Sequence, residues 1–275
     1  MRVKNVKILL KKYGIRPLKS LGQNFLVDEK VFDRIMRAAE LSSNDVVLEI
    51  GPGIGNLTLR LGERTQKVIA IEKDKKMCEI LKKMLESQNI KNIKVINQDA
   101  LKLDFSQYTQ KPYKLVANLP YYITSPVIRK FLELKKPPKS MILMVQKEVA
   151  QRICAKPPKL SVLAVSVQFY AKPKIISYIS KKSFWPQPKV DSAIIKIIPF
   201  KVGRSQKYTE KFFKIVKAGF SHPRKQLINN LSKGLSLEKQ RIEKWLLKNK
   251  IQPTQRAETL SVEYWQKLTK TYSKI

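Results

Sequence analysis

The sequence contains a single histidine, His222, and only two cysteines, Cys78 and Cys154. One histidine excludes a histidine-based catalytic triad and a metal site built from several histidines. The two cysteines cannot form a disulfide framework, and their spacing matches no metal-binding motif. We therefore expect a protein that uses no metal and works in a reducing cytoplasm.

Long hydrophobic runs are also missing. The longest apolar stretches, such as residues 141–145, are much shorter than the roughly 18 residues that suggest a membrane-spanning helix. The apolar residues 8–10 near the basic N-terminus are too few for the core of a signal peptide. A hydrophobic fraction of 43% instead supports a globular protein.

Acidic residues are scarce. The chain has 21 Asp and Glu against 56 Lys and Arg, which gives a formal net charge of +35. A small domain usually carries a net charge of about 2 to 8, so the excess predicts a polyanionic partner, with nucleic acid as the first candidate. A lysine-rich genome or binding to a membrane surface are the alternatives. Residues 1–20 hold seven basic side chains and no acid.

Strand-like and helix-like patterns alternate between about residues 30 and 150. Buried strands are predicted at 46–50, 68–72, 93–96, 114–117 and 141–145, and helices at 56–61 and 75–87. This alternation predicts an α/β fold with a mostly parallel, doubly wound sheet, in which ligands bind beyond the carboxyl ends of the strands. The residues expected along that edge are Gly51, Glu72, Asp99 and Asn118.

Glycine is rare as well, with nine in the chain, yet three of them stand at positions 51, 53 and 55. Such concentration predicts a backbone that closely approaches a ligand. The spacing is G-x-G-x-G rather than the dinucleotide pattern G-x-G-x-x-G, which favours a nucleoside cofactor without a diphosphate. Glu72 can accept hydrogen bonds from two ribose hydroxyls and Asp99 from an adenine amino group, although a turn or helix cap is the alternative for Asp99.

The tetrapeptide Asn118-Leu119-Pro120-Tyr121 combines an uncharged amide acceptor, a kinked backbone and an aromatic face. A side-chain oxygen and a nearby backbone carbonyl can accept both N–H bonds of an exocyclic base nitrogen, and so localise and aim its lone pair. An amide suits this task because an unpaired buried carboxylate costs far more. Tyr121 offers a stacking surface for a base removed from its strand. The alternative is a strand-end asparagine before a proline turn.

Several motifs occur together in a fixed order. They are Leu21-Gly22-Gln23-Asn24-Phe25-Leu26, Glu49-Ile50-Gly51-Pro52-Gly53-Ile54-Gly55-Asn56-Leu57-Thr58, Asn118-Leu119-Pro120-Tyr121-Tyr122-Ile123, Ser183-Phe184-Trp185-Pro186-Gln187-Pro188-Lys189-Val190-Asp191-Ser192 and Arg256-Ala257-Glu258-Thr259-Leu260-Ser261. From about residue 16 to its end the sequence closely resembles the ribosomal RNA adenine N6-dimethyltransferases, which use S-adenosylmethionine. The resemblance implies a Rossmann-like class I methyltransferase domain followed by a small C-terminal all-α domain.

The resemblance also implies roles for individual residues. The implied cofactor-binding residues are Asn24, Leu26, Gly51, Glu72, Asp99 and Asn118. The implied catalytic residues are Asn118, which lies between cofactor and target amine, and Tyr121 and Phe184, which stack on the flipped adenine. For Phe184 the alternative is an ordinary core phenylalanine. We predict direct in-line methyl transfer from the sulfonium to N6, which requires no metal.

We predict a methyltransferase domain with a basic N-terminal arm over residues 1–200 and a helical RNA-binding domain over residues 201–275. Helical patterns in the second domain lie at 207–220, 224–235, 237–248 and 263–271. From residue 200 onward, 18 Lys or Arg stand against five acids, which suits tracking of RNA phosphates, with a solvated lysine-rich surface as the alternative.

The family has two branches. Leu119 and the step Val190-Asp191-Ser192 favour the small-subunit branch, whose members act on two adjacent adenosines in the 3′-terminal hairpin loop of 16S ribosomal RNA. We expect a monomer that acts on a pre-ribosomal particle in ribosome biogenesis. The alternatives are a large-subunit enzyme of the macrolide-resistance type and a ribosome-assembly factor without catalysis.

Overall fold

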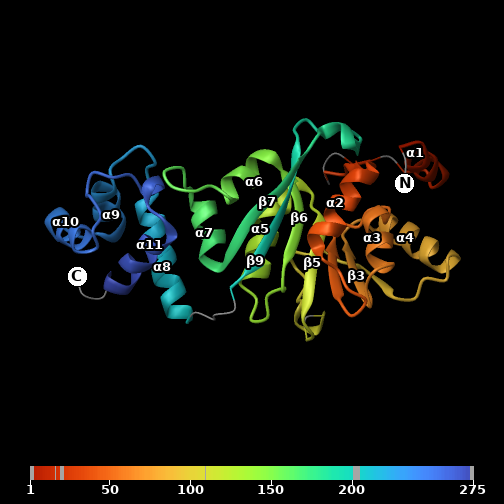
Figure 1. Cartoon of the computed structure of the whole chain (residues 1–275), viewed down its shortest axis with the longest axis horizontal. Coiled ribbons are helices and arrows are strands. Elements are labelled where there is room, and N and C mark those ends of the chain that lie inside the picture. The colour runs from red at the N-terminus through yellow and green to blue at the C-terminus, as the bar shows by residue number, and fades with distance from the viewer. Residues whose placement is uncertain (1–2, 16, 19–21, 109, 201–204, 273–275) are drawn as a thin grey trace. The chain divides into compact units, whose positions relative to one another are not determined.

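The computed structural model describes residues 3–15, 17–18, 22–108, 110–200 and 205–272. The chain divides into two compact units (Figure 1), the first comprising Met1–Ala150 with Pro173–Pro199 and the second Gln151–Lys172 with Phe200–Ile275. Each unit has its own hydrophobic core.

A seven-stranded sheet forms the centre of the first unit. Its strand order is β4 (Ile93–Asn97), β3 (Lys67–Glu72), β2 (Val46–Ile50), β5 (Tyr113–Asn118), β6 (Met141–Gln146), β9 (Ser192–Pro199) and β7 (Ala171–Ile179). The neighbours from β4 to β6 pair in parallel, and β9 pairs antiparallel with β6. The continuous apolar runs of β2, β3 and β6 fit strands that are covered on both faces. The predicted mostly parallel, doubly wound sheet is confirmed.

Helices cover both faces of this sheet. Helices α2 (Glu29–Ala39), α3 (Asn56–Gly62) and α4 (Lys75–Ser87) share one core cluster with alternate strand residues such as Val116. Strand side chains alternate between faces, so Tyr113 points the opposite way from Val116. Phe131 of α5 (Thr124–Leu132) lies 6.5 Å from Tyr113 between ring centroids, which places α5 on the opposite face.

Short elements complete the first unit and its junction with the second. They are α1 (Val3–Lys12), β1 (Phe25–Leu26), η2 (Ser106–Tyr108), η3 (Tyr121–Ile123), α6 (Lys147–Ile153), η4 (Lys181–Ser183) and β8 (Phe184–Trp185). Strands β1 and β8 form a separate two-stranded antiparallel sheet in which Leu26 lies opposite Phe184.

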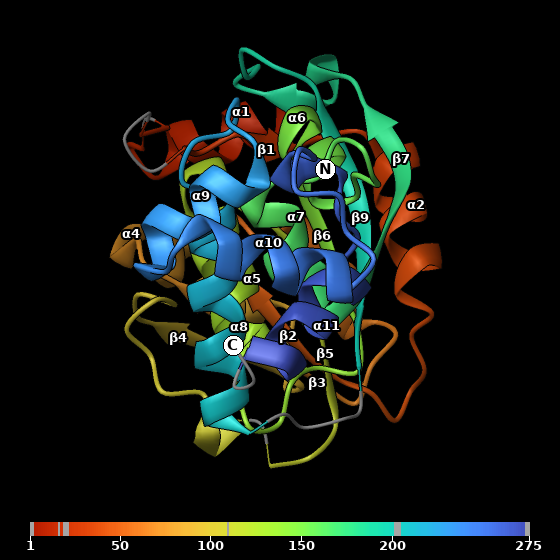
Figure 2. The same ribbon diagram turned by 90° about the vertical axis from the view of Figure 1, so that its left-hand side faces the viewer.

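The second unit is helical, and its helices can be followed in Figure 2. It contains α7 (Val162–Tyr170), α8 (Gln206–Gly219), α9 (Leu227–Leu235), α10 (Lys239–Lys248), η5 (Ala257–Thr259) and α11 (Val262–Thr271). Its extent differs from the boundary expected at residue 200, because it also takes residues 151–172. The physical reason is aromatic packing: Phe169 of α7 stacks on Phe212 of α8 with ring centroids 4.0 Å apart.

None of the helices in the described part of the chain combines the length and the apolar character needed to cross a bilayer.

The core of the second unit leaves no space beside Gly219, the last residue of α8. A Cβ atom built there would lie 2.3 Å from Cη2 of Trp265, which is fully buried. We expect Gly219→Ala to lower the free energy of unfolding by about 1–3 kcal/mol through overpacking, despite the better helix propensity of alanine. Chemical denaturation measures the effect. The control Lys217→Ala, at an exposed position of the same helix, should change stability by less than about 0.5 kcal/mol.

Candidate active site at the carboxyl edge of the sheet

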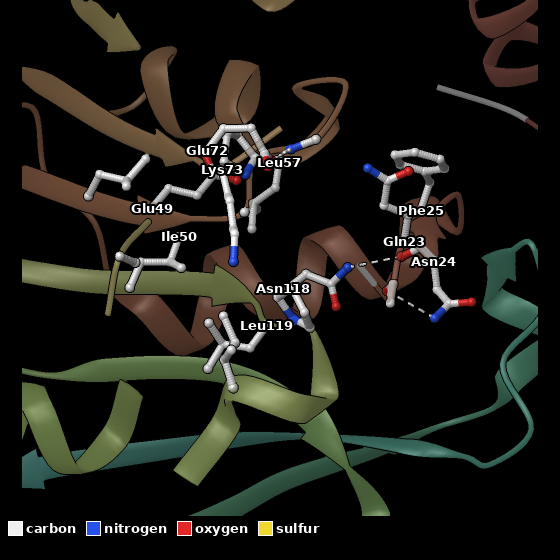
Figure 3. Close-up of a pocket in the computed structure, with 18 of the residues that line it drawn as sticks. Gln23, Asn24, Phe25, Glu49, Ile50, Leu57, Glu72, Lys73, Asn118 and Leu119 are labelled. Carbon is white, nitrogen blue, oxygen red and sulfur yellow. Dashed lines mark hydrogen bonds between the residues drawn. The ribbon is translucent and has the colours of Figure 1, made fainter. Parts of the chain in front are cut away.

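One pocket brings together residues that follow the carboxyl ends of neighbouring strands. It is lined by all eight residues that the sequence singled out, namely Asn24, Leu26, Gly51, Glu72, Asp99, Asn118, Tyr121 and Phe184. Figure 3 shows the pocket with β2, β3 and β5 converging on it from one side and the segment around Asn24 closing the other. Gly51, Glu72, Asp99 and Asn118 lie at the edge of the sheet that the parallel strands predict, and the other four residues line the same pocket. The individual roles of all eight stay predictions.

The glycine-rich turn after β2 depends on residues without a side chain. Gly51, Gly53 and Gly55 have φ angles of 71°, 55° and 84°, in the left-handed region that favours glycine. A Cβ atom at Gly51 would lie 3.4 Å from Cδ of Pro120, which belongs to the tetrapeptide after β5. The turn thus exposes bare backbone to the pocket, and it touches the segment that carries Asn118.

Glu72 is the fixed acceptor at the end of β3. Its Oε2 accepts the backbone N–H of Gly53 at 3.0 Å, and its Oε1 accepts that of Asp74 at 2.9 Å. Burial raises the pKa of Glu72, and the two backbone donors act in the opposite direction. A carboxylate oxygen can accept more than one hydrogen bond, so the group retains acceptor capacity for ligand hydroxyls.

Asp99 follows β4 and has two local contacts. Its Oδ1 accepts the N–H of Leu101 at 2.9 Å, and its Oδ2 lies 3.0 Å from Nζ of Lys73. The Leu101 N–H, followed by Lys73, lowers the pKa of Asp99 despite its partial burial. The structure therefore contains the turn-capping contact that was the alternative for Asp99, and the same ionised side chain also lines the pocket.

Asn118 closes β5 with an oriented amide. Its Nδ2 donates to the carbonyl oxygen of Asn24 at 3.3 Å, as the dashed line in Figure 3 shows. No donor within the described ranges bonds to Asn118 Oδ1. The amide nitrogen is thus used for anchoring, and the oxygen stays available as an acceptor in the pocket.

Two aromatic residues line the same pocket. The hydroxyl of Tyr121 lies 2.7 Å from Oγ of Ser192, which is fully buried at the start of β9. Burial raises the pKa of Tyr121, so its phenol stays protonated. Phe184 is 4% exposed and belongs to a core cluster as well as to the pocket wall. The Phe184 ring is therefore both a core residue and part of the pocket wall.

The N-terminal segment reaches the pocket through backbone contacts. Asn24 donates its own Nδ2 to the carbonyl of Gly22 at 3.1 Å and offers its carbonyl oxygen to Asn118. The carbonyl of Leu26 accepts Nδ2 of Asn56, at the first turn of α3, at 2.9 Å. The bond from Asn118 to Asn24 and the bond from Asn56 to Leu26 hold the N-terminal segment against β5 and α3, which are distant in the sequence.

Glu49 is a pocket residue to which the sequence analysis assigned no role. It lies within β2, is 1% exposed, and its Oε2 has no hydrogen-bond partner among the described residues. Burial, aided by the neighbouring charge of Glu72, raises the pKa of Glu49 to about 8. An acidic residue inside an otherwise apolar strand was the available signal, because a buried carboxyl needs a partner.

Comparisons with known proteins give the family. The sequence profile of the ribosomal RNA adenine dimethylase family matches residues 16–274. The chain belongs to this family. A relative from Dehalococcoides mccartyi, a ribosomal RNA small subunit methyltransferase A, is 43% identical over 270 residues, which cover 97% of this chain and 92% of the relative.

Two solved structures resemble about nine-tenths of the chain. A dimethyladenosine transferase from Plasmodium falciparum has a TM-score of 0.77 and 29% identity, and the match covers 91% of this chain and 98% of the other. The 23S rRNA methyltransferase ErmE has a TM-score of 0.73 and 27% identity, with 90% and 98% covered. The predicted family, fold class, enzyme class and cofactor, S-adenosylmethionine, are thereby confirmed.

The residues present fit this cofactor. It carries a positive charge, and the pocket contains the buried Glu49 carboxyl with one oxygen unpartnered in the described chain. It also carries a ribose and an adenine, for which Glu72 and Asp99 offer acceptors. A cation near Glu49 would favour the ionised carboxylate and offset part of its desolvation.

Glu49 yields a pH prediction. Above about pH 8 the carboxyl loses its proton, so a cationic ligand gains an attraction that a neutral one lacks. We expect the affinity for S-adenosylmethionine, relative to the uncharged-sulfur product S-adenosylhomocysteine, to rise by about threefold to tenfold as pH increases through this value. Calorimetric titration of both ligands measures the ratio. In Glu49→Gln the ratio should stay constant, and a rise that persists there would exclude Glu49 as its source.

The hydrogen bond between Tyr121 and Ser192 can be tested by a double-mutant cycle. Tyr121→Phe and Ser192→Ala each remove one half of the 2.7 Å contact while keeping the aromatic ring. If the bond orients the ring, each change should lower methyl-transfer turnover by about threefold to tenfold, and the double variant should be no slower than the worse single variant. Fully multiplicative losses would contradict the idea that the two residues act through this contact.

Proposed function

We propose that the protein dimethylates N6 of two adjacent adenosines in the 3′-terminal hairpin loop of 16S ribosomal RNA. It does so as a cytoplasmic monomer on a pre-ribosomal particle during ribosome biogenesis. The observation that carries this proposal is the available amide oxygen of Asn118, which shares one pocket with the strand-end acceptors Glu72 and Asp99 and with two aromatic rings. The small-subunit assignment is supported by the 43% identity to ribosomal RNA small subunit methyltransferase A.

Asn118 orients the target amine. Its Oδ1 accepts one N6–H, and a neighbouring backbone carbonyl accepts the other, so the nitrogen lone pair is localised and aimed. The carbonyl of Pro120 already accepts the N–H of Ile123 at 3.1 Å, so we favour that of Leu119 as the second acceptor. The anchored Nδ2 of Asn118 keeps the amide from rotating, because a flip would break its bond to Asn24.

The aromatic side chains hold the extruded base. Tyr121 and Phe184 stack on its two faces, and the contact of Tyr121 with Ser192 fixes the plane of the tyrosine ring. Bound S-adenosylmethionine supplies an electrophilic methyl group on a positively charged sulfur. Positioning of the amine against it is the main contribution of the protein, and proximity of this kind can lower a barrier by about 7 to 11 kcal/mol.

Proton release needs no strong base in this site. Asn118 is uncharged and cannot take the proton, so the proton leaves to solvent after methyl transfer. In the second round the monomethylated amine has one N–H left, and Asn118 and the carbonyl share a single donor. The residues that orient the first transfer therefore also orient the second, with one hydrogen bond fewer.

RNA binding is assigned to the basic regions outside the pocket. Lys7, Lys11 and Lys12 are exposed on α1, and the second unit carries all 18 basic residues found from residue 200 onward. Such side chains bind phosphates without reading sequence, which leaves the choice of base to the pocket and to RNA shape.

A labelling experiment tests the substrate. The protein is incubated with radiolabelled S-adenosylmethionine and, separately, with unmethylated small-subunit particles, large-subunit particles and naked RNA, and the RNA is then digested to nucleosides. Label in dimethyladenosine from the small subunit alone supports the proposal. Label from the large subunit would support the activity named for ErmE, to which the fold is also similar. No label in any sample would favour an assembly factor.

Asn118→Ala gives the test of the catalytic assignment. We expect kcat to fall by about 100-fold or more, the scale seen when a group that acts on the transition state is removed. RNA affinity, measured by filter binding, should change little because the basic regions are untouched. The matched control Asn44→Ala changes the same residue type at an exposed position and should keep normal turnover. Near-normal turnover of Asn118→Ala would falsify the assignment.

A further inference from the structure

Helix α1 precedes the segment that the family profile matches, yet it packs tightly on the first unit. Val6 and Leu10, four residues apart on one helix face, are 0% and 2% exposed. On the opposite face Ile8 is 57% exposed. The helix therefore has one buried apolar face, a feature that differs from the basic arm predicted for this region.

The buried face of α1 packs against residues that also line the pocket. Val6 and Leu10 form a core cluster with Phe25, Ile54 and Met77, and Figure 1 shows α1 on the side of the unit where α3 and α4 lie. Two of these partners, Phe25 and Ile54, also line the pocket. Helix α1 thus lies behind the pocket wall.

Phe25 and Ile54 both lie on segments with little regular secondary structure. Phe25 belongs to β1, a strand of two residues, and Ile54 belongs to the glycine turn between β2 and α3. The Phe25 ring also lies against the turn, since a Cβ atom built at Gly53 would be 3.1 Å from its Cε1. Side-chain packing therefore adds to the hydrogen bonds from Glu72 and Asn56 that hold these segments, because regular strand pairing is short there.

A second contact links α1 to the other side of the pocket. Nζ of Lys7 lies 5.6 Å from the centre of the Trp185 ring, and Trp185 pairs with Phe25 between β8 and β1. Phe184, the neighbour of Trp185, lines the pocket. The helix therefore contacts both strands of the small sheet that borders the site.

We propose that α1 is a positioning element of the cofactor site, which holds Phe25 and Ile54 in the pocket wall. This rests on the proposed function only for the identity of the ligand. When α1 is undocked, both side chains lose their apolar cover and the glycine turn populates arrangements that do not bind cofactor. The apparent affinity then falls by the fraction of molecules that leave the competent arrangement.

Leu10→Ala tests this, with Ile8→Ala as the matched control. Both changes shorten a side chain of the same size in the same helix, and only Leu10 is buried. The full-length protein is titrated with S-adenosylhomocysteine in the absence of RNA by calorimetry. We expect Leu10→Ala to weaken binding by about fivefold or more and Ile8→Ala by less than about twofold. Equal affinities for the two variants would overturn the proposal.

Steady-state kinetics separate positioning from general stability. Leu10→Ala should raise KM for S-adenosylmethionine while leaving kcat at saturating cofactor and the Kd for RNA close to wild type, and Leu10→Met should restore the KM. A fall in kcat with unchanged KM would sink the idea. If the wild type itself does not bind S-adenosylhomocysteine, the proposed function fails; if only the difference between variants is missing, the role of α1 fails.

Hydrogen exchange tests the wild-type protein, so it applies even if Leu10→Ala does not fold. Coupling between two sites is reciprocal, so cofactor binding must stabilise the docked helix as much as the helix stabilises cofactor binding. Saturation with S-adenosylhomocysteine should slow amide exchange in residues 6–12 by about fivefold or more. Unchanged exchange at saturation would contradict the proposal.

Discussion

The carboxylate of Glu72 is the point on which the cofactor half of the site depends. Its two oxygens bind the N–H groups of Gly53 and Asp74, and Oδ2 of Asp74 accepts Nε2 of Gln23 at 2.9 Å. One buried acid thereby connects the end of β3, the glycine turn, the start of α4 and the N-terminal segment. Backbone donors offset part of the desolvation of the charge and hold the acceptor in place before any ligand arrives.

The distribution of charge follows from two ligands of opposite sign. Three acids, Glu49, Glu72 and Asp99, line one pocket of a chain whose net charge is +35. A cationic cofactor is stabilised by these acceptors and in turn favours the ionised form of Glu49. A polyanionic RNA is attracted by the positive charge of the surrounding surface. The two demands do not conflict, because the three acids are gathered in one pocket at the end of the sheet, whereas most of the basic side chains are exposed.

Much of this could be predicted from the sequence because the signals are local. Strand β2 was predicted at its observed bounds from a continuous apolar run, and α4 from its amphipathic pattern. Parallel strands then bring their carboxyl ends together, which is why Glu72 and Asn118 were expected at one edge. Helices α8 to α11 of the second unit were likewise expected from their patterns, with bounds that differ by up to three residues, whereas α7 was not predicted.

The rest depends on contacts that have no local pattern. The pairing of β1 with β8 joins two-residue strands that are far apart in the sequence, and it decides that Phe184 is both core and pocket wall. The unpartnered oxygen of Glu49 appears only when the surrounding chain is folded. Residues 151–172 join the helical unit through aromatic packing rather than through any change in composition.

The contact between Gly51 and Pro120 places a geometric limit on this enzyme. The glycine turn after β2 and the loop after β5 meet there, with no side chain on one side and a rigid ring on the other. Glycine cannot be made smaller, so at this contact extra room could come only from the proline. Because proline restricts the backbone beside Asn118, replacing it would also loosen the position of the acceptor amide.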